Sequence, residues 1–133
     1  MIKTANIEFI MGRAGTGKTR KLVNMAFNEA LKGNYVYMVS DELDKDEFNT
    51  QIIQLLLDRL NLELGELTSL ETCSEMQQAI SKRIFFGAKL DEVYAGQCSL
   101  ILIDNQEVEG EYLMKLRKKF LTAHIAVAKT INN

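Results

Sequence analysis

The sequence is poor in the residues that most often build disulfides, metal sites and loops. Its 133 residues include no proline, no tryptophan, 2 cysteines and 1 histidine. Cys73 and Cys98 stand alone in the chain, which excludes a disulfide framework or a multi-cysteine zinc site, and each is interpreted as a buried thiol. His124 has no acid or second ligand type near it in the sequence and is interpreted as structural. Two isolated thiols fit a reducing compartment, and we expect a cytoplasmic protein.

Long apolar segments and an excess of positive charge are also missing. Runs such as residues 100–103 are far shorter than the roughly 20 residues of a membrane-spanning helix. The N-terminal MIKTANIEF lacks the apolar core of a signal peptide, so we expect neither secretion nor a membrane partner. The chain has 16 Lys and Arg residues against 18 Asp and Glu residues, a net charge of -2. This balance excludes the wide basic surface that drives nucleic-acid binding, so any such contact is expected to be local.

The remaining composition is typical of one folded domain. Hydrophobic residues make up 47% of the chain and charged residues 26%, which is enough apolar matter for a packed core. A length of 133 residues is close to the commonest domain size. We therefore expect residues 1–133 to form a single domain.

Apolar stretches of two different periods alternate along the chain. Short β-branched and aromatic runs predict strands at residues 7–11, 35–40, 99–104 and 124–128. Helical periodicity and capping residues predict helices at residues 17–32, 44–60, 74–85 and 111–121, with Asp44 and Glu47 as a capping box. Residues 67–70 are a candidate further strand in an otherwise ambiguous stretch.

This alternation predicts an α/β fold. Helices of ten or more residues between strands imply right-handed crossovers and a parallel sheet. The run SLILID at residues 99–104 is apolar on both faces, as a strand covered by helices on both sides must be. We expect a three-layer α/β/α sandwich with a mainly parallel sheet of four or five strands, in which the strand at residues 7–11 is central.

A glycine-rich segment, GRAGTGKT, follows the first predicted strand. It satisfies G-x-x-x-x-G-K-[ST], the P-loop or Walker A motif, at every fixed position and precedes a predicted helix, which is the context that the motif requires. Glycine permits the positive φ angles that turn successive N–H groups toward a phosphate, and the helix N-terminus adds its dipole. The alternative is a glycine-rich turn without a ligand. The expected nucleotide-binding residues are Gly12, Arg13, Ala14, Gly15, Thr16, Gly17, Lys18, Thr19 and Arg20.

Two side chains of this segment have specific expected roles. Lys18 is expected to neutralise the β- and γ-phosphates, and the Thr19 hydroxyl to bind Mg²⁺. Arg13, Ala14 and Thr16 are expected to contribute backbone groups only. The motif thus predicts a nucleoside triphosphate and Mg²⁺ as the ligands; ATP is the expected nucleotide, and the motif alone does not separate it from GTP.

Asp104 ends the most apolar predicted strand. A triphosphate site needs a carboxylate near the metal, normally at the carboxyl end of a buried strand, and Asp104 is in that position. The alternative is an ordinary turn aspartate after a strand. Many P-loop ATPases have a glutamate directly after this aspartate, but Asn105 and Gln106 follow here.

The catalytic base must therefore come from elsewhere. Glu42 follows the second predicted strand, and parallel strands end at the same edge of the sheet, where ligands bind. Asp41 is its rival, and spacing alone does not separate the two. Glu107 and Glu109 lie in a polar loop and are weaker candidates.

These motifs together resemble the RecA-like ATPases, and within them the DnaB-type replicative helicases and KaiC-like proteins. The second strand of that family ends in Ser-x-Glu-hydrophobic, as in Ser40-Asp41-Glu42-Leu43, and its glutamate is the catalytic base, which the resemblance assigns to Glu42. The family's Walker B strand ends in an aspartate without an adjacent glutamate, as at Asp104. The family's next strand ends in a sensor of the γ-phosphate, which places Lys129 or Thr130 near the sensor position.

The sequence also departs from this family. The helicase sensor is usually glutamine, and the family's DNA-binding loop, further strand and arginine finger cannot be located before residue 133. The resemblance therefore implies a minimal helicase-like or accessory ATPase that needs a homo-oligomer or a helicase-like partner for efficient hydrolysis. The P-loop spelling is also similar to superfamily-one helicases, but their Asp-Glu pair and second core domain are missing.

Two other functional classes stay open. One is a non-catalytic nucleotide-binding module that regulates a helicase or recombinase assembly. The other is a small nucleoside or nucleotide kinase, against which stands the lack of an arginine-rich lid segment between Gly87 and Gly110. A nucleic-acid partner has weak support from a short basic cluster that alternates with apolar residues like an ordinary solvated helix face. That cluster comprises Lys115, Arg117, Lys118 and Lys119.

Overall fold

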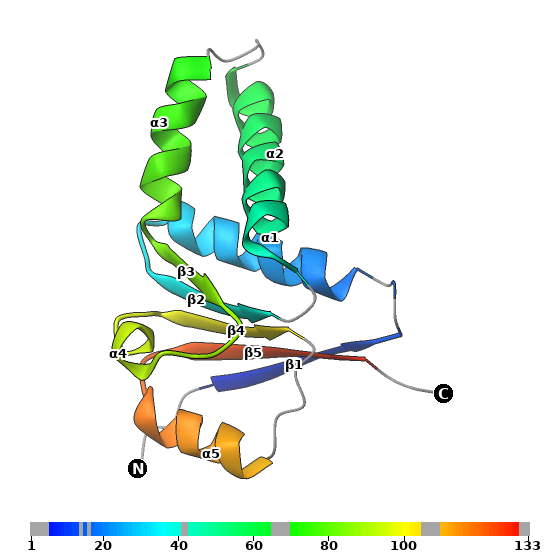
Figure 1. The fold of residues 1–133 in the computed structure, drawn as a ribbon, viewed down its shortest axis with the longest axis vertical. Coiled ribbons are helices and arrows are strands. Elements are labelled where there is room, and N and C mark those ends of the chain that lie inside the picture. Colours follow the sequence, from blue (N-terminus) through cyan, green and yellow to red (C-terminus); the bar gives the residue numbers. More distant parts are fainter. Residues whose placement is uncertain are drawn as a thin grey trace.

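The computed structural model describes residues 6–13, 15, 17–40, 43–64, 70–104 and 110–130. Strands and helices alternate along this part of the chain (Figure 1). The strands are β1 (Asn6–Gly12), β2 (Val36–Ser40), β3 (Ile84–Gly87), β4 (Leu100–Asp104) and β5 (His124–Thr130). The helices are α1 (Lys18–Leu31), α2 (Lys45–Leu64), α3 (Leu70–Ser81), α4 (Glu92–Ala95) and α5 (Gly110–Lys119).

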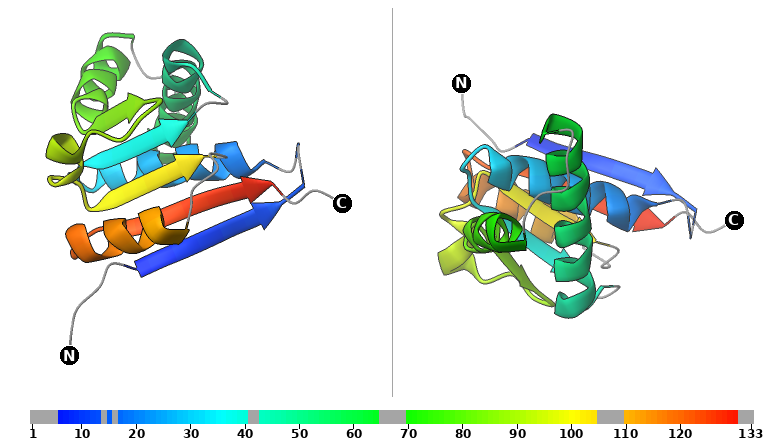
Figure 2. Two further views of the ribbon diagram at one scale, coloured as in Figure 1. Left: turned by 60° about the horizontal axis from the view of Figure 1, so that its bottom comes forward. Right: turned by 90° about the horizontal axis from the view of Figure 1, so that it is seen from above.

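The strands form one five-stranded sheet in the order β1-β5-β4-β2-β3, and every pair is parallel. Strand β4 is central, as its run of five buried residues requires. The predicted central position of the strand before the glycine-rich segment is wrong, because β1 pairs only with β5 and forms an edge of the described sheet (Figure 2). The burial pattern of β1 agrees, since Phe9 and Met11 are exposed and Ile10 is buried.

Two apolar cores, one on each face of the sheet, confirm the three-layer sandwich. Side chains alternate along a strand, so Leu100 and Leu102 belong to one core, and Ile101 and Ile103 to the other. Helices α1, α2 and α3 cover the first core, and α4 and α5 the second (Figures 1 and 2). We call these the α1 face and the α5 face.

The region between α2 and β4 differs from its prediction. A helix was expected over residues 74–85, but α3 ends at Ser81 and residues 84–87 form strand β3, paired with β2. The aromatic run Phe85-Phe86 suits a strand better than a helix, and Phe86 stacks on Phe48 of α2 with ring centroids 4.7 Å apart. Of the candidate strand at residues 67–70, Leu70 begins α3 and the rest lies outside the described residues.

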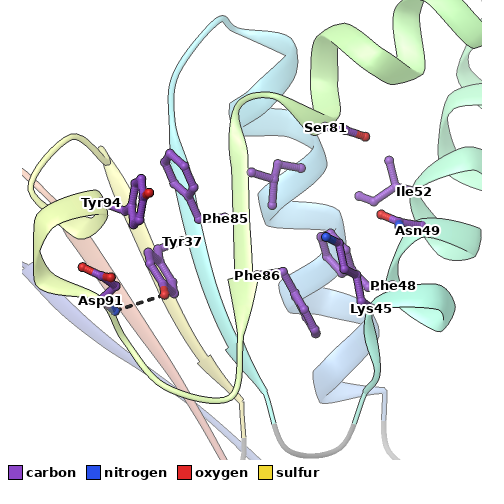
Figure 3. A pocket seen from close by; sticks show the side chains of 11 residues that line it. Tyr37, Lys45, Phe48, Asn49, Ile52, Ser81, Phe85, Phe86, Asp91 and Tyr94 are labelled. Atoms are coloured by element: carbon purple, nitrogen blue, oxygen red, sulfur yellow. Dashed lines mark hydrogen bonds between the residues drawn. The ribbon is translucent and has the colours of Figure 1, made fainter.

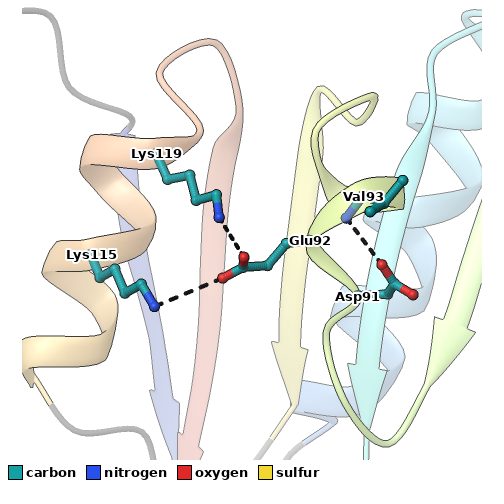
Figure 4. A network of polar contacts seen from close by, with 5 residues as sticks. All are labelled: Asp91, Glu92, Val93, Lys115 and Lys119. Atoms are coloured by element: carbon teal, nitrogen blue, oxygen red, sulfur yellow. Dashed lines mark hydrogen bonds and ion pairs between the residues drawn. The ribbon is translucent and has the colours of Figure 1, made fainter.

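A short helix that was not predicted, α4, lies on the α5 face, where Glu92 reaches toward α5 (Figure 4). Its N-cap is Asp91, whose carboxylate accepts a hydrogen bond of 3.0 Å from the Val93 amide. Glu92 forms ion pairs with Lys119 and, at 4.0 Å, with Lys115 of α5. Two of the four residues in the basic cluster are therefore engaged with an acid of their own fold.

Cys98 and His124, two of the scarce residues of this chain, occupy structural positions. Cys98 is buried, as expected, and burial raises the pKa of its thiol to about 11. His124 begins β5, and its Nε2 atom lies 3.0 Å from Oε2 of Glu8 on the neighbouring strand β1. An acid that is distant in the sequence is therefore its partner, and this contact joins two strands of the sheet.

Among the helices that the structure describes, none is long and apolar enough to cross a membrane.

Candidate functional site

The carboxyl ends of strands β1, β5, β4 and β2 lie side by side at the same end of the parallel sheet. The strand register places Gly12 beside Thr130 and Ser40 beside Asp104. By the alternation of side chains, Ser40 and Asp104 both point to the α1 face, because they follow Met38 and Leu102 by two residues. The glycine-rich segment begins at this same end of the sheet, at Gly12, and leads into α1.

Two glycines of the segment adopt the left-handed backbone that favours this residue. Gly15 and Gly17 have φ angles of 79° and 83°, and a Cβ on either would meet nothing within 4 Å. Glycine is therefore needed for its conformation and not for lack of space. Gly17 is the N-cap of α1, and no side chain among the described residues caps that end of the helix. Ala14 and Thr16 lie outside the described residues.

Lys18, the first residue of α1, reaches back toward the segment before it. Its ammonium group donates a hydrogen bond of 2.6 Å to the carbonyl oxygen of Arg13. The positive charge of Lys18 is therefore held beside the backbone of the segment and close to the N-terminus of α1. Arg20 is exposed in the first turn of α1.

Thr19 and Asp104, which are 85 residues apart in the sequence, are in direct contact. The Thr19 hydroxyl lies 3.1 Å from Oδ1 and 3.0 Å from Oδ2 of Asp104. The Ser40 hydroxyl donates a hydrogen bond of 2.8 Å to the same Oδ2. Asp104 is only 1% exposed, so these hydroxyl groups stabilise a carboxylate that is almost fully withdrawn from water.

This donor set suits Mg²⁺. Mg²⁺ prefers oxygen ligands and usually combines one or two protein groups with substrate phosphates and water. Thr19 and Asp104 offer a hydroxyl and a carboxylate next to the glycine-rich segment. Within the described ranges, no three His, Cys, Asp or Glu residues gather in a way that could hold a metal ion. A hydroxyl and a carboxylate are ligands that Mg²⁺ can share with a phosphate and with water.

The two candidate sensor residues lie at the end of β5 and point to opposite faces of the sheet. The ammonium group of Lys129 lies over the ring of Phe9, 5.7 Å from its centroid, and Val127 places this side of β5 on the α5 face. Thr130 follows Ala126 and Ala128 on the α1 face and is paired with Gly12. Of the two, Thr130 lies on the side of the sheet where Thr19 and Asp104 meet.

The candidate base and its rivals lie outside the described residues. These are Asp41, Glu42, Glu107 and Glu109. The residues on either side of positions 41–42 are described, and they are linked because the Leu43 amide donates a hydrogen bond of 3.2 Å to the Ser40 hydroxyl. Ser40 had no predicted role of its own. The signal that could have indicated a role is that Ser40 ends β2 and Asp104 ends the neighbouring strand β4, which brings a hydroxyl beside a carboxylate.

A pocket of about 380 Å³ lies elsewhere, at the β3 edge of the sheet (Figure 3). Aromatic side chains from both faces line it, including Tyr37, Phe85 and Tyr94 on one side and Phe48 and Phe86 on the other. The Tyr37 hydroxyl accepts from the Asp91 amide at 3.0 Å and donates to the Lys89 carbonyl at 2.9 Å. None of the predicted site residues lines this pocket, so it is separate from the Thr19–Asp104 contact.

Comparison with known proteins finds similar solved structures but no matching family model or curated sequence. No protein-family model matches the sequence, and no curated protein sequence matches it. Among solved structures, the flagellar accessory protein FlaH from Methanocaldococcus jannaschii matches 97% of this chain with a TM-score of 0.61 and 16% identity. A DnaB-like replicative helicase, solved for its interactions with primase, matches 96% with a TM-score of 0.60 and 17% identity. A third solved structure, of an ATPase domain, matches 96% with a TM-score of 0.59 and 16% identity.

This chain spans only part of each of those proteins, namely 62%, 39% and 58% of their lengths in the same order. At this level of identity the likeness concerns the fold and not the chemistry. The match nevertheless covers nearly all of this chain in each case. The described residues thus share the fold of these three structures, a parallel sheet with helices on both faces.

Proposed function

We propose that this chain is a Mg²⁺-dependent, ATP-binding ATPase domain of the RecA-like type. The observation that carries the proposal is the contact of the Thr19 hydroxyl, at the start of α1, with the buried carboxylate of Asp104. Thr19 is the last residue of a complete P-loop motif, and two glycines of that motif have a left-handed backbone. Asp104 and the P-loop come from distant parts of the sequence, so their meeting is a second, independent argument for a triphosphate site.

Each residue of this site has a role that its position supports. The α1 N-terminus and the amide groups of the glycine-rich segment would bind the phosphates, and Lys18 would neutralise the β- and γ-phosphate charge. Thr19 would contribute its hydroxyl to the metal, and Asp104 would hold the water shell of the metal. When bound, Mg²⁺ would neutralise phosphate charge.

Hydrolysis requires a group that orients the attacking water, and we assign this role to Glu42. Support comes from its place just after β2, whose neighbour β4 ends in Asp104, and from the family resemblance. Thr130 is the better candidate for a γ-phosphate sensor, since its side of β5 belongs to the α1 face. A kinase is a weaker proposal, because the chain between Gly87 and Gly110 lacks an arginine-rich lid.

Efficient turnover is proposed to depend on another protein chain. An arginine supplied in trans accelerates many P-loop enzymes by several orders of magnitude, and the family resemblance extends this arrangement to the present chain. The partner would be a second copy of this chain or a helicase-like protein in the cytoplasm. Nucleic acid has less support, since Lys115 and Lys119 form ion pairs with Glu92.

The test is nucleotide binding by a Lys18→Ala variant, measured by calorimetry with a non-hydrolysable ATP analogue and Mg²⁺. Loss of a charge-assisted hydrogen bond costs about 1.5–3 kcal/mol, so the dissociation constant is expected to rise by about 10-fold or more. Lys21→Ala removes the same charge from an exposed position on α1 and is the matched control, expected to bind as the wild type does. Equal affinity of the Lys18→Ala and Lys21→Ala variants contradicts the proposal.

Turnover of labelled ATP separates catalysis from binding alone. The isolated chain is expected to hydrolyse ATP slowly and to accelerate at higher chain concentration or with a helicase-like partner, and the assay is repeated with single-stranded DNA. Tight, Lys18-dependent binding without turnover under any of these conditions would favour the non-catalytic regulatory module.

A further inference from the structure

Ser40 links the buried carboxylate of the site to the segment that follows β2. Ser40 is only 4% exposed, and its hydroxyl donates to Oδ2 of Asp104 at 2.8 Å. The same hydroxyl accepts a hydrogen bond of 3.2 Å from the amide of Leu43, which is itself buried. The two residues that separate Ser40 from Leu43 in the sequence include Glu42.

The direction of these hydrogen bonds is fixed by chemistry. An amide N–H can only donate, so the Ser40 oxygen must accept from Leu43, and its single proton is then directed to the carboxylate. Such a chain of bonds is polarised toward its anionic end and is stronger in a buried, low-dielectric place. The position of Leu43 and the orientation of Asp104 are therefore linked through one hydroxyl group.

We infer that Ser40 is a positioning residue that couples the orientation of the metal-binding carboxylate of Asp104 to the amide of Leu43, between β2 and α2. This inference rests on the proposed function. The Thr19 hydroxyl could bind a metal through its oxygen and still donate its proton to Asp104. Ser40 is not a predicted metal ligand, so its bond would keep Asp104 oriented when the metal is bound, and the Leu43 amide holds the Ser40 hydroxyl in place.

A first measurement tests the geometry without any nucleotide. Amide hydrogen exchange, followed by NMR on the full chain, is expected to show a protected Leu43 amide in the wild type. Ser40→Ala removes the acceptor and is expected to speed exchange at Leu43 by about 10-fold or more. Ser99→Ala is the matched control, because the Ser99 hydroxyl bonds to the Tyr35 carbonyl at 3.4 Å beyond the opposite end of β4. It is expected to leave Leu43 unchanged.

A second measurement tests the role toward Mg²⁺. Binding of the non-hydrolysable ATP analogue is titrated with Mg²⁺, and separately measured in EDTA. Mg²⁺ is expected to tighten binding of the analogue, and Ser40→Ala is expected to raise the Mg²⁺ concentration that gives half of this gain by about 10-fold. This is a typical cost of losing a group that orients a metal ligand. Its affinity in EDTA is expected to stay within about twofold of the wild type. Ser40→Thr, which keeps a hydroxyl, is expected to restore the wild-type Mg²⁺ requirement.

The outcomes separate this inference from the proposed function. If Ser40→Ala does not fold, Ser40→Cys has a similar volume and a weak donor, and it is expected to raise the Mg²⁺ requirement in the same direction. An unchanged Mg²⁺ requirement in a folded Ser40 variant, with Lys18→Ala still weakening binding, overturns the inference and leaves the proposed function standing. Equal binding by the Lys18→Ala and Lys21→Ala variants overturns both.

Discussion

Among single residues, the candidate site depends on a few polar groups in a mostly apolar setting. Asp104 is 1% exposed and accepts hydrogen bonds from Thr19 and Ser40. A carboxylate with so little water is stabilised by its donors, and removing a donor costs more than the bond itself because the charge stays buried. The three side chains therefore act as a unit, and single substitutions are expected to affect both stability and ligand binding.

Thr19→Val tests the hydroxyl at the centre of this unit. Valine has nearly the shape of threonine, so the change removes the bonds to Asp104 and the expected metal ligand with little change in packing. Thermal unfolding is expected to show a loss of about 1–3 kcal/mol, and calorimetry a weaker Mg²⁺-dependent binding of the ATP analogue. Thr50→Val, on the exposed side of α2, removes one hydroxyl bond to the Asp46 carbonyl and is the control. Equal results for the two variants would count against the role of Thr19.

Glu92 allows a test of electrostatics away from the site. The ammonium group of Lys119, followed by that of Lys115, holds the pKa of the Glu92 carboxyl below its ordinary value of 4.5. A lowered pKa in the folded state means that the ion pair stabilises the fold above the ordinary pKa, and that this contribution is lost as the pH falls through the lowered value. NMR titration is expected to find the pKa of Glu92 below 4.5 and to find it raised in Lys119→Met. An unchanged pKa in that variant would contradict the pairing.

Among the helices and strands, the sequence predicts most elements within a few residues. The capping box, in which the Glu47 amide donates to Asp44 at 2.8 Å, and the apolar run of β4 are local signals that tertiary structure did not change. The prediction failed at β3, where helical spacing through residue 85 competed with an aromatic run. Residues 84–87 form a strand because they pair with β2 and because Phe86 stacks on Phe48. Both partners lie in distant parts of the chain.

Phe48→Ala tests the packing that places β3. Phe48 is 3% exposed and stacks on Phe86, so the variant is expected to lose about 3–5 kcal/mol in free energy of unfolding. Phe9→Ala removes a ring that is 49% exposed and is expected to cost far less. Denaturant unfolding of the two variants checks the difference, and a comparable loss in both would contradict the placement of β3 against α2.

In the molecule as a whole, the order of strands in the sheet does not follow from their order in the sequence. The sequence indicates parallel strands linked by helices, and the structure agrees, but β5 is inserted between β1 and β4 and so leaves β1 at an edge. The position of the site residues could be predicted without knowing this order. All strands of a parallel sheet have their carboxyl ends on the same side. Gly12, Ser40 and Asp104 therefore lie on that side whatever the order of their strands.

The proposal that Thr19 and Asp104 form a magnesium-dependent triphosphate site is decided by one comparison. Binding of a non-hydrolysable ATP analogue is measured by calorimetry with and without Mg²⁺ for the wild type and for Asp104→Asn, a variant of nearly equal shape whose fold is checked by circular dichroism. We expect Mg²⁺ to tighten binding by the wild type by about 10-fold or more. Asp104→Asn is expected to bind like the wild type in EDTA and to gain little from Mg²⁺. An equal gain from Mg²⁺ in both proteins would contradict the proposal.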